Sequence, residues 1–388
     1  MQPHHRLYAS FFAFSFTLGS FFSRLPDIQT SLGAKESELG LVLIGSSLGA
    51  LTGLTFAAPV IARLGTRLAI AVPLMGIAAL CAAVPYAPTL TWTFSVLLLQ
   101  GMMVGALEVC LNVETDRRAA SLGHGIMSRA HSLWSFGFFV AALIGAVVRQ
   151  FGVPTWAHLT GVIPIVAFII ATVVLKIRPA PVRTGSSEME GPLFALPTLG
   201  MLGLCLIAFS PMLAEGAGVD WSLIYMRDVF ASDPIIAGLA LSAFTLVMAV
   251  ARWFADPVVD RLGARMATGW LLSLVGGGAL MIAIAPNAAS AIIGFTMMGL
   301  GCSAVYPITI SAAAQRTDRP AAINVAALGQ SAFVIFFLGP PLLGFVAEYF
   351  GIRSSYLVCL PIVVASLFCL RSLNGPQPKT ESAVKHGT

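Results

Sequence analysis

Long apolar runs fill most of the chain, and short clusters of glycine, proline and charged residues separate them. Runs of this kind are long enough to cross a bilayer as helices, which takes roughly 20 residues each. The pattern predicts twelve such helices, and the even number places both termini on one side of the membrane. The expected ranges are 6–24, 37–61, 67–87, 91–113, 127–149, 155–176, 195–225, 234–255, 266–286, 289–312, 322–349 and 354–371.

The composition agrees with a protein that lies almost entirely within the bilayer. Of the 388 residues, 57% are hydrophobic and only 10% are charged, and the mean hydropathy is +0.88. Soluble domains carry about 25% charged residues, so the composition excludes a soluble enzyme, a disordered protein and a nucleic-acid binder. The fold class expected is an all-α membrane protein. The first apolar run resembles a signal peptide, but no small-residue cleavage site follows it, so we expect it to remain as the first helix.

The distribution of basic residues predicts the orientation. Fifteen of the 22 Lys and Arg residues lie in loops and ends that share a side with the two termini, and five lie on the other side. Basic residues accumulate on the cytoplasmic side of bacterial inner-membrane proteins. We therefore expect both termini in the cytoplasm, and the net charge of +5 needs no nucleic-acid partner.

An internal repeat divides the chain into two halves. Residues 57–69 (AAPVIARLGTRLA) and 255–267 (ADPVVDRLGARMA) share eight of thirteen identities at an offset of 198, and further matches occur at offset 199. Parallel repeats of this kind are an architecture of secondary transporters. The predicted parts are an N-terminal six-helix half (1–177), a cytoplasmic linker (178–193), a C-terminal six-helix half (194–373) and a polar cytoplasmic tail (374–388).

The repeated segment carries a recognisable loop motif. It resembles the signature G-x-x-x-D-R-x-G-R of the major facilitator superfamily, except that Ala62 stands where the family has Asp. The resemblance implies twelve helices in two pseudo-symmetric six-helix halves, and transport by alternating access. It also implies a gating role for the motif residues, while the alternative is that they serve only as positive-inside anchors. These residues are Arg63, Gly65, Arg67, Asp260, Arg261, Gly263 and Arg265.

A finer resemblance rests on three segments. The segments 23–27 (SRLPD), 108–112 (EVCLN) and 215–225 (EGAGVDWSLIY) resemble the fucose-permease-like branch of that family, and a poorly characterised bacterial inner-membrane group within it. In the fucose permeases an acidic residue of helix 4 takes part in proton coupling, and Glu108 matches that position. A sugar or sugar-like solute is favoured by this resemblance alone.

Glu108 is also a candidate functional residue because it is an acidic residue within an apolar helix. An ionised carboxylate that faces lipid costs several kcal/mol, so Glu108 must face a central cavity, pair with a cation or be protonated. Asn112 follows four residues later and shares its helix face. The alternative is a helix-packing hydrogen bond. Because no ATP-binding motif occurs, proton symport through Glu108 is the expected mode of concentrative transport.

Several polar and aromatic residues inside apolar helices are candidates for substrate binding. The repeat relates Glu108 to Tyr306 and His131 to Gln330, as expected if both halves line one cavity. Glu215 precedes two glycines, which predict that helix 7 bends or breaks there. Ordinary packing is the alternative for each of them. The full set of substrate-binding candidates is Asn112, His131, Trp134, Glu215, Trp221, Tyr306 and Gln330.

Two further charge pairs are candidates for gating. Arg24 and Asp27 end the first helix and form an outer gate or a solvated loop pair. Arg252 and Asp256 lie four residues apart on helix 8, a spacing that suits a gating or structural ion pair.

The chain lacks the motifs of enzymes and metalloproteins. No phosphate-binding loop, HExxH motif, paired CxxC or nucleophile elbow occurs, so we expect no enzyme activity, no cofactor and no metal. The expected partners are a small-molecule substrate, protons and the lipid bilayer, with no nucleic acid and a monomeric protein. Two rival functions stay open: a proton-coupled exporter of amphipathic compounds, and a membrane sensor or scaffold that transports nothing.

Overall fold

The computed structural model describes residues 2–181 and 195–373, and every regular element within them is a helix. The helices are α1 (Pro3–Phe22), α2 (Leu25–Leu32), α3 (Glu36–Ala83), η1 (Val84–Tyr86), α4 (Leu90–Leu122), α5 (Met127–Gln150), α6 (Thr155–Thr172), η2 (Val174–Lys176), η3 (Leu199–Met201), α7 (Leu202–Phe230), α8 (Pro234–Trp253), α9 (Ala255–Leu262), α10 (Ala264–Ile284), α11 (Ala288–Cys302), α12 (Val305–Ala314), α13 (Ala321–Phe350), α14 (Ile352–Leu357), α15 (Cys359–Phe368) and η4 (Leu370–Leu373).

Ten segments of the described chain are long and apolar enough to cross a membrane. Two of them, Glu36–Phe56 and Arg63–Tyr86, belong largely to the single long helix α3. The helix α1 and the apolar segment Ile352–Phe368 complete the twelve crossings that the sequence predicts. The predicted fold class is therefore confirmed. Most of the predicted linker and the whole tail lie outside the described residues.

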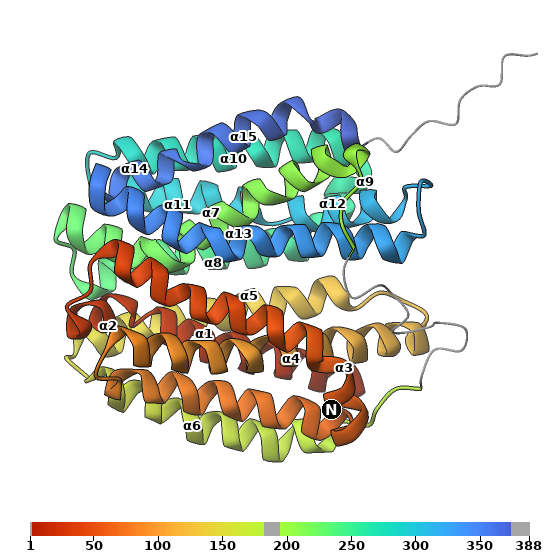
Figure 1. The fold of residues 1–388 in the computed structure, drawn as a ribbon, viewed down its shortest axis with the longest axis horizontal. Coiled ribbons are helices and arrows are strands. Elements are labelled where there is room, and N and C mark those ends of the chain that lie inside the picture. Colours follow the sequence, from red (N-terminus) through yellow and green to blue (C-terminus); the bar gives the residue numbers. More distant parts are fainter. Residues whose placement is uncertain (1, 182–194, 374–388) are drawn as a thin grey trace, which may run out of the picture.

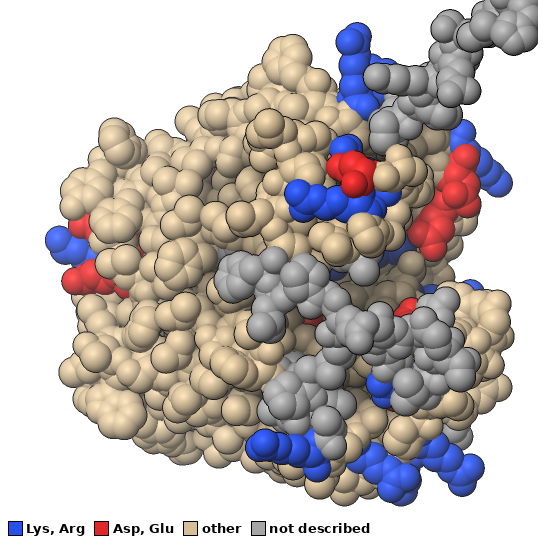
Figure 2. All heavy atoms as spheres, turned by 45° about the vertical axis from the view of Figure 1, so that its right-hand side comes forward, with Lys and Arg blue, Asp and Glu red and all other residues tan. Residues whose placement is uncertain are grey.

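The helices form two blocks that lie side by side, α1–α6 in one and α7–α15 in the other (Figure 1). The start of the chain, residues 181 and 195, and residue 373 all lie at the same end of the molecule. We call this the linker end, and the end that carries α2 and the α7–α8 connection the opposite end. On the face that Figure 2 shows, charged side chains gather near the two ends, and a broad uncharged area lies between them. This distribution suits a protein whose middle faces lipid.

The two blocks repeat the same backbone turns. Gly65, which kinks α3 between its two crossings, has φ +70°, and its counterpart in the repeat, Gly263, has φ +79°. Gly152 and Gly351, which the second offset relates, have φ +68° and +84°. Side chains other than glycine rarely adopt this left-handed region. The repeat seen in the sequence therefore has a counterpart in the backbone.

Helices α3 and α4 touch through their backbones. A Cβ atom added at Gly49 or at Gly101 would lie 2.0 Å from a carbonyl oxygen of the other helix, and at Gly53 or Gly105 the same distance would be 2.1 Å. Small residues let membrane helices approach closely enough for extensive van der Waals contact. Helix α3 also packs along α13 of the other block. The glycines thus fix the position of α4, which carries Glu108.

Candidate functional site

The two blocks meet along two lines of helix packing. Helix α5 packs on α8, and α3 packs on α13. At the opposite end, α2 adds a contact with α7. The candidate site consists of the polar groups that lie near these contacts, midway between the ends.

Glu108 of α4 and Tyr306 of α12 lie close enough for an electrostatic interaction across the two blocks. A Cβ atom at Gly329 of α13 would lie 3.8 Å from the Tyr306 hydroxyl oxygen, so α13 borders the same space. Glu108 is half-buried and makes no hydrogen bond or ion pair with any residue that the structure describes. The structure thus brings together two residues that the internal repeat relates.

Asn112 lies one helical turn from Glu108. It is half-buried, and its side-chain oxygen Oδ1 is enclosed without a hydrogen-bond partner among the described atoms. A buried polar atom left without a partner costs about 1–3 kcal/mol. Asn112 is therefore free to accept a hydrogen bond from a solute or from water.

Arg252 of α8 joins three groups from different helices. Its Nη2 lies 3.3 Å from Oε2 of Glu215, its Nη1 donates to Oγ of Ser135 at 2.9 Å, and its Nε donates to the carbonyl oxygen of Ser303 at 3.0 Å. Ser135 belongs to the N-terminal block and the other groups to the C-terminal one. The predicted pair of Arg252 with Asp256 is absent from the described contacts, and Asp256 instead accepts a hydrogen bond from Ser128 at 3.3 Å.

Sequence reasoning missed this central role of Arg252. Its position in the sequence could have indicated this role, because Arg252 lies near the end of an apolar helix that contains no other basic residue. His131 of α5 lies within electrostatic range of Arg252, and its ring centroid lies 5.3 Å from that of Phe11. His131 therefore borders the same polar cluster.

Of the bend or break predicted for helix 7 after Glu215, the break is absent. Helix α7 runs without interruption past Glu215, because Gly216 has open space around it and Gly218 packs against the ring of Phe244. The tenth membrane crossing, by contrast, is interrupted: it consists of the two helices α11 and α12. The cause of the interruption is Pro307, which lacks an N–H and whose ring excludes the carbonyl four residues earlier. That carbonyl belongs to Ser303, and Arg252 takes it up.

Two aromatic candidates pack against neighbouring side chains, Trp134 half-buried and Trp221 fully buried. Trp134 packs against Phe14 and Phe138, with ring centroids 6.3 and 5.7 Å away, all within the N-terminal block. Trp221 has no exposed surface, and its Cη2 atom lies 3.2 Å from where a Cβ atom on Gly344 would stand. In this conformation both residues contribute packing.

Gln330 contacts the chain that enters the C-terminal block. Its Oε1 accepts a hydrogen bond from the backbone N–H of Ala195 at 2.8 Å. In this conformation its amide oxygen is therefore bonded to the backbone at the start of the C-terminal block. A solute that reaches Gln330 would have to compete with Ala195 for that oxygen.

The expected ion pair of Arg24 and Asp27 is present, with 3.2 Å between Nε and Oδ2. Arg149 of α5 adds a closer, two-point contact to the same carboxylate, with Nη2 3.0 Å from Oδ1 and Nε 3.0 Å from Oδ2. All three residues belong to the N-terminal block. The pair therefore ties α2 to α5 and does not itself join the two halves.

Other residues join the two halves at the opposite end. Arg227 of α7 donates to Gln29 Oε1 at 2.8 Å, to Thr30 Oγ1 at 3.3 Å and to the carbonyl oxygen of Pro26 at 3.1 Å. A second link is the ion pair between Lys35 and Glu348, at 3.5 Å. These contacts close the opposite end, and no local motif in the sequence reveals them.

The motif loops lie at the linker end. Gly65 and Gly263 make the left-handed turns described above, and Arg67 donates from Nε to the carbonyl oxygen of Ile177 at 2.7 Å. Among the described parts of the chain, no hydrogen bond or ion pair joins a motif residue to the other half. The remaining four are exposed: Arg63, Asp260, Arg261 and Arg265. The side chain of Ala62 lies outside the described ones.

A pair of arginines related by the repeat secures the chain at the linker end. Arg118 contacts Glu114 at 3.5 Å, and its counterpart in the second half, Arg316, contacts Asp318 at 2.9 Å. The hydrogen bonds from Arg316 hold the pKa of Asp318 well below its usual range. Within the described residues, no group of three His, Cys, Asp or Glu side chains is arranged to hold a metal ion.

Comparison with known proteins shows which family the chain resembles. The model of the Major Facilitator Superfamily matches residues 201–387. The uncharacterised transporter y4wD of Sinorhizobium fredii is 28% identical over 366 residues, which cover 92% of this chain and 94% of that protein.

Solved structures share the fold. The nucleoside transporter NupG aligns with a TM-score of 0.70 at 14% identity, over 97% of this chain and 100% of that one. The E. coli fucose:proton symporter FucP aligns with a TM-score of 0.64 at 17% identity, over 96% and 98%. Taken with the twelve crossings and the two repeated blocks, these matches show that the chain has the major facilitator fold and that its relatives are multi-pass membrane transporters of that superfamily, not enzymes.

Proposed function

We propose that this transporter moves a small polar organic solute, a sugar or sugar-like compound, across a bacterial inner membrane by proton symport. The two halves alternate in exposing one central site to the two sides. The positive-inside distribution of Lys and Arg assigns the linker end, with both termini, to the cytoplasm. In this assignment the conformation described above is closed toward the outside.

The observation that carries the proposal is the unpartnered carboxyl group of Glu108. It lies within electrostatic range of Tyr306 of the other half, and no described cation pairs with it. A charged carboxylate is costly in this setting, so proton binding at Glu108 is favoured when the site is closed. A change of exposure would then load the proton on one side and release it on the other.

The surrounding groups support a polar solute. Asn112 offers an unsatisfied amide oxygen, Tyr306 a hydroxyl group, and Glu215 a carboxylate that is held by Arg252. Such groups donate and accept several hydrogen bonds, as recognition of a hydroxyl-rich solute needs. The names of the structural neighbours NupG and FucP state nucleoside and fucose transport for those proteins, and both solutes carry several hydroxyl groups.

Transport by purified protein in proteoliposomes tests the proposal. Uptake of labelled sugars, polyols and nucleosides would be measured with an inward proton gradient, and solute exchange without one. We expect Glu108→Gln to abolish accumulation driven by the gradient and to leave exchange intact. The matched control is Asp233→Asn, which neutralises an exposed acid that makes no side-chain cap contact.

Other outcomes point to the rival functions. Accumulation that survives Glu108→Gln would refute the coupling role of this residue. Efflux of amphipathic compounds against the same gradient would identify an exporter, in which the same carboxyl group serves antiport. A protein that binds a solute without any flux would be a sensor or scaffold.

A further inference from the structure

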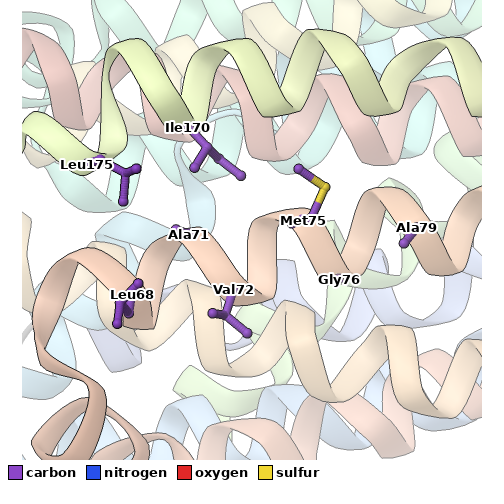
Figure 3. Close-up of a pocket in the computed structure, with 8 residues that line it drawn as sticks. All are labelled: Leu68, Ala71, Val72, Met75, Gly76, Ala79, Ile170 and Leu175. Atoms are coloured by element: carbon purple, nitrogen blue, oxygen red, sulfur yellow. The ribbon is translucent and has the colours of Figure 1, made fainter.

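A groove of about 530 Å³ lies between α3 and α6 on the outer face of the N-terminal block. In Figure 3, Ile170 and Leu175 point toward α3, and Met75 points from α3 toward α6. Leu68, Val72 and Leu175 are each more than 40% exposed. All the lining residues are apolar, and they are Leu68, Ala71, Val72, Met75, Gly76, Ala79, Ile170 and Leu175. The groove therefore faces the lipid rather than the path between the halves.

The groove has the length of one lipid chain. Its lining on α3 runs from Leu68 to Ala79, a rise of about 16 Å at 1.5 Å per residue. Half of the hydrocarbon core of a bilayer is about 15 Å thick. A single acyl chain from the leaflet at the linker end thus matches the groove from end to end.

Basic side chains stand at the linker end of the groove. Arg67 precedes Leu68, Arg63 lies four residues before Arg67 on the other side of the Gly65 turn, and Lys176 follows Leu175; all three are exposed. Among the described residues, Arg67 donates from Nε to the carbonyl oxygen of Ile177, and the side chains of Arg63 and Lys176 make no hydrogen bond or ion pair. The lining segments, residues 68–79 and 170–175, contain no acidic residue. The apolar groove therefore ends in positive charge at the depth of lipid headgroups.

We infer that this groove binds one anionic phospholipid, with an acyl chain between α3 and α6 and the headgroup phosphate beside Arg63, Arg67 and Lys176. Basic pockets between membrane helices suit anionic headgroups for this reason. The site is separate from the transport path, so the inference does not depend on the solute. A bound lipid would join α3 to α6 near the point where Arg67 of α3 bonds to Ile177, the residue that follows η2.

Native mass spectrometry of the full-length protein tests the inference. The protein would be reconstituted with equal amounts of phosphatidylglycerol and phosphatidylcholine of identical acyl chains, and the retained lipids counted. We expect one phosphatidylglycerol to be retained in preference to phosphatidylcholine. Arg63→Gln with Lys176→Gln should weaken that preference by about fivefold for each charge removed. Equal retention of the two lipids by the unaltered protein would overturn the inference, and this comparison needs no variant.

A second variant separates the groove from the charges. Ala79→Phe should fill the groove and abolish retention, since Ala79 is exposed at its far end. The control is Gly161→Phe, on the same helix as Ile170, where a side chain meets open space outside the groove. Retention that persists in Ala79→Phe, or that is lost equally in Gly161→Phe, would show that the lipid binds elsewhere.

Discussion

The Nη2 atom of Arg252 lies 3.3 Å from Oε2 of Glu215, and the same guanidinium group also reaches Ser135 in the other half. The two charged side chains are 17% and 21% exposed. They are therefore shielded from bulk water but not sealed from it. One cation thus connects helix 7, helix 8 and the N-terminal block at the centre of the molecule.

Removal of either partner of this pair should destabilise the protein through the charge that is left behind. We expect Arg252→Gln to lower the free energy of unfolding by about 3 kcal/mol, because a shielded carboxylate stays unpaired. Glu215→Gln should cost about 1–2 kcal/mol, since Arg252 keeps its other two acceptors. The double variant should be more stable than the sum predicts, which thermal melting in detergent would measure. Strict additivity would show that the pair contributes nothing.

Arg227 should hold the opposite end closed. Arg227→Gln removes hydrogen bonds to three groups of the other half, each worth about 1 kcal/mol. The distance between spin labels at Ser31 and Asp233, one in each half, should then shift toward longer values. The labels require Cys369→Ser, because the other five cysteines are buried.

A matched arginine at the same end provides the control for this experiment. Arg353 donates to the carbonyl oxygen of Ala283 within its own half and lies over the ring of Phe230. Arg353→Gln removes the same charge and should leave the distance distribution unchanged. A shift of equal size in both variants would assign the effect to net charge and not to the contacts of Arg227.

Ala231 occupies a backbone position that suits glycine better. It has φ +48°, and among the described residues it is the one non-glycine residue with positive φ. Its counterpart in the first half of the repeat, Gly33, has φ +60°. Left-handed alanine costs about 1–2 kcal/mol, and glycine returns part of this through the unfolded chain. Ala231→Gly should therefore stabilise the folded protein by about 0.5–1 kcal/mol. Gly33→Ala should destabilise it. A lower melting temperature for Ala231→Gly would contradict this expectation.

The glycine contact of α3 with α4 should tolerate no side chain. Gly49→Ala places a Cβ atom 2.0 Å from a backbone oxygen, so the helices must separate, at a cost of about 3 kcal/mol or more. Gly216→Ala is the control, because open space surrounds Gly216 and alanine favours a helix. The melting temperature should fall in the first variant and stay or rise in the second. Equal melting temperatures would mean that the helices part without cost.

The fold was predictable because each helix carries its own apolar run, and because the repeat marks the halves. Even the left-handed turns at Gly65 and Gly263 follow from the motif, since only glycine enters that region freely. The interruption between α11 and α12 was predictable in principle from Pro307. The glycines after Glu215 were misleading, because glycine weakens a helix by only about 1 kcal/mol, and packing against Phe244 outweighs that.

The site was less predictable, because its contacts join residues that lie far apart in the chain. Arg252 reaches Ser135 across 117 positions and Arg227 reaches Gln29 across 198. Neither contact has a local pattern. The relation of Glu108 to Tyr306 was accessible only because the repeat supplied a long-range link. The placement of Trp221 depends on Gly344 in a helix of the same half, which no spacing rule reveals.

The direct backbone contact between α3 and α4 has a mechanical consequence. Glu108 follows Gly105 by less than one helical turn, and Gly105 lies against the backbone of α3 with no side chain between them to absorb a displacement. Helix α3 in turn packs along α13 of the other half. Any sliding or tilting between the halves is therefore transmitted, through two helices that move as one stiff body, to the position of a single carboxyl group.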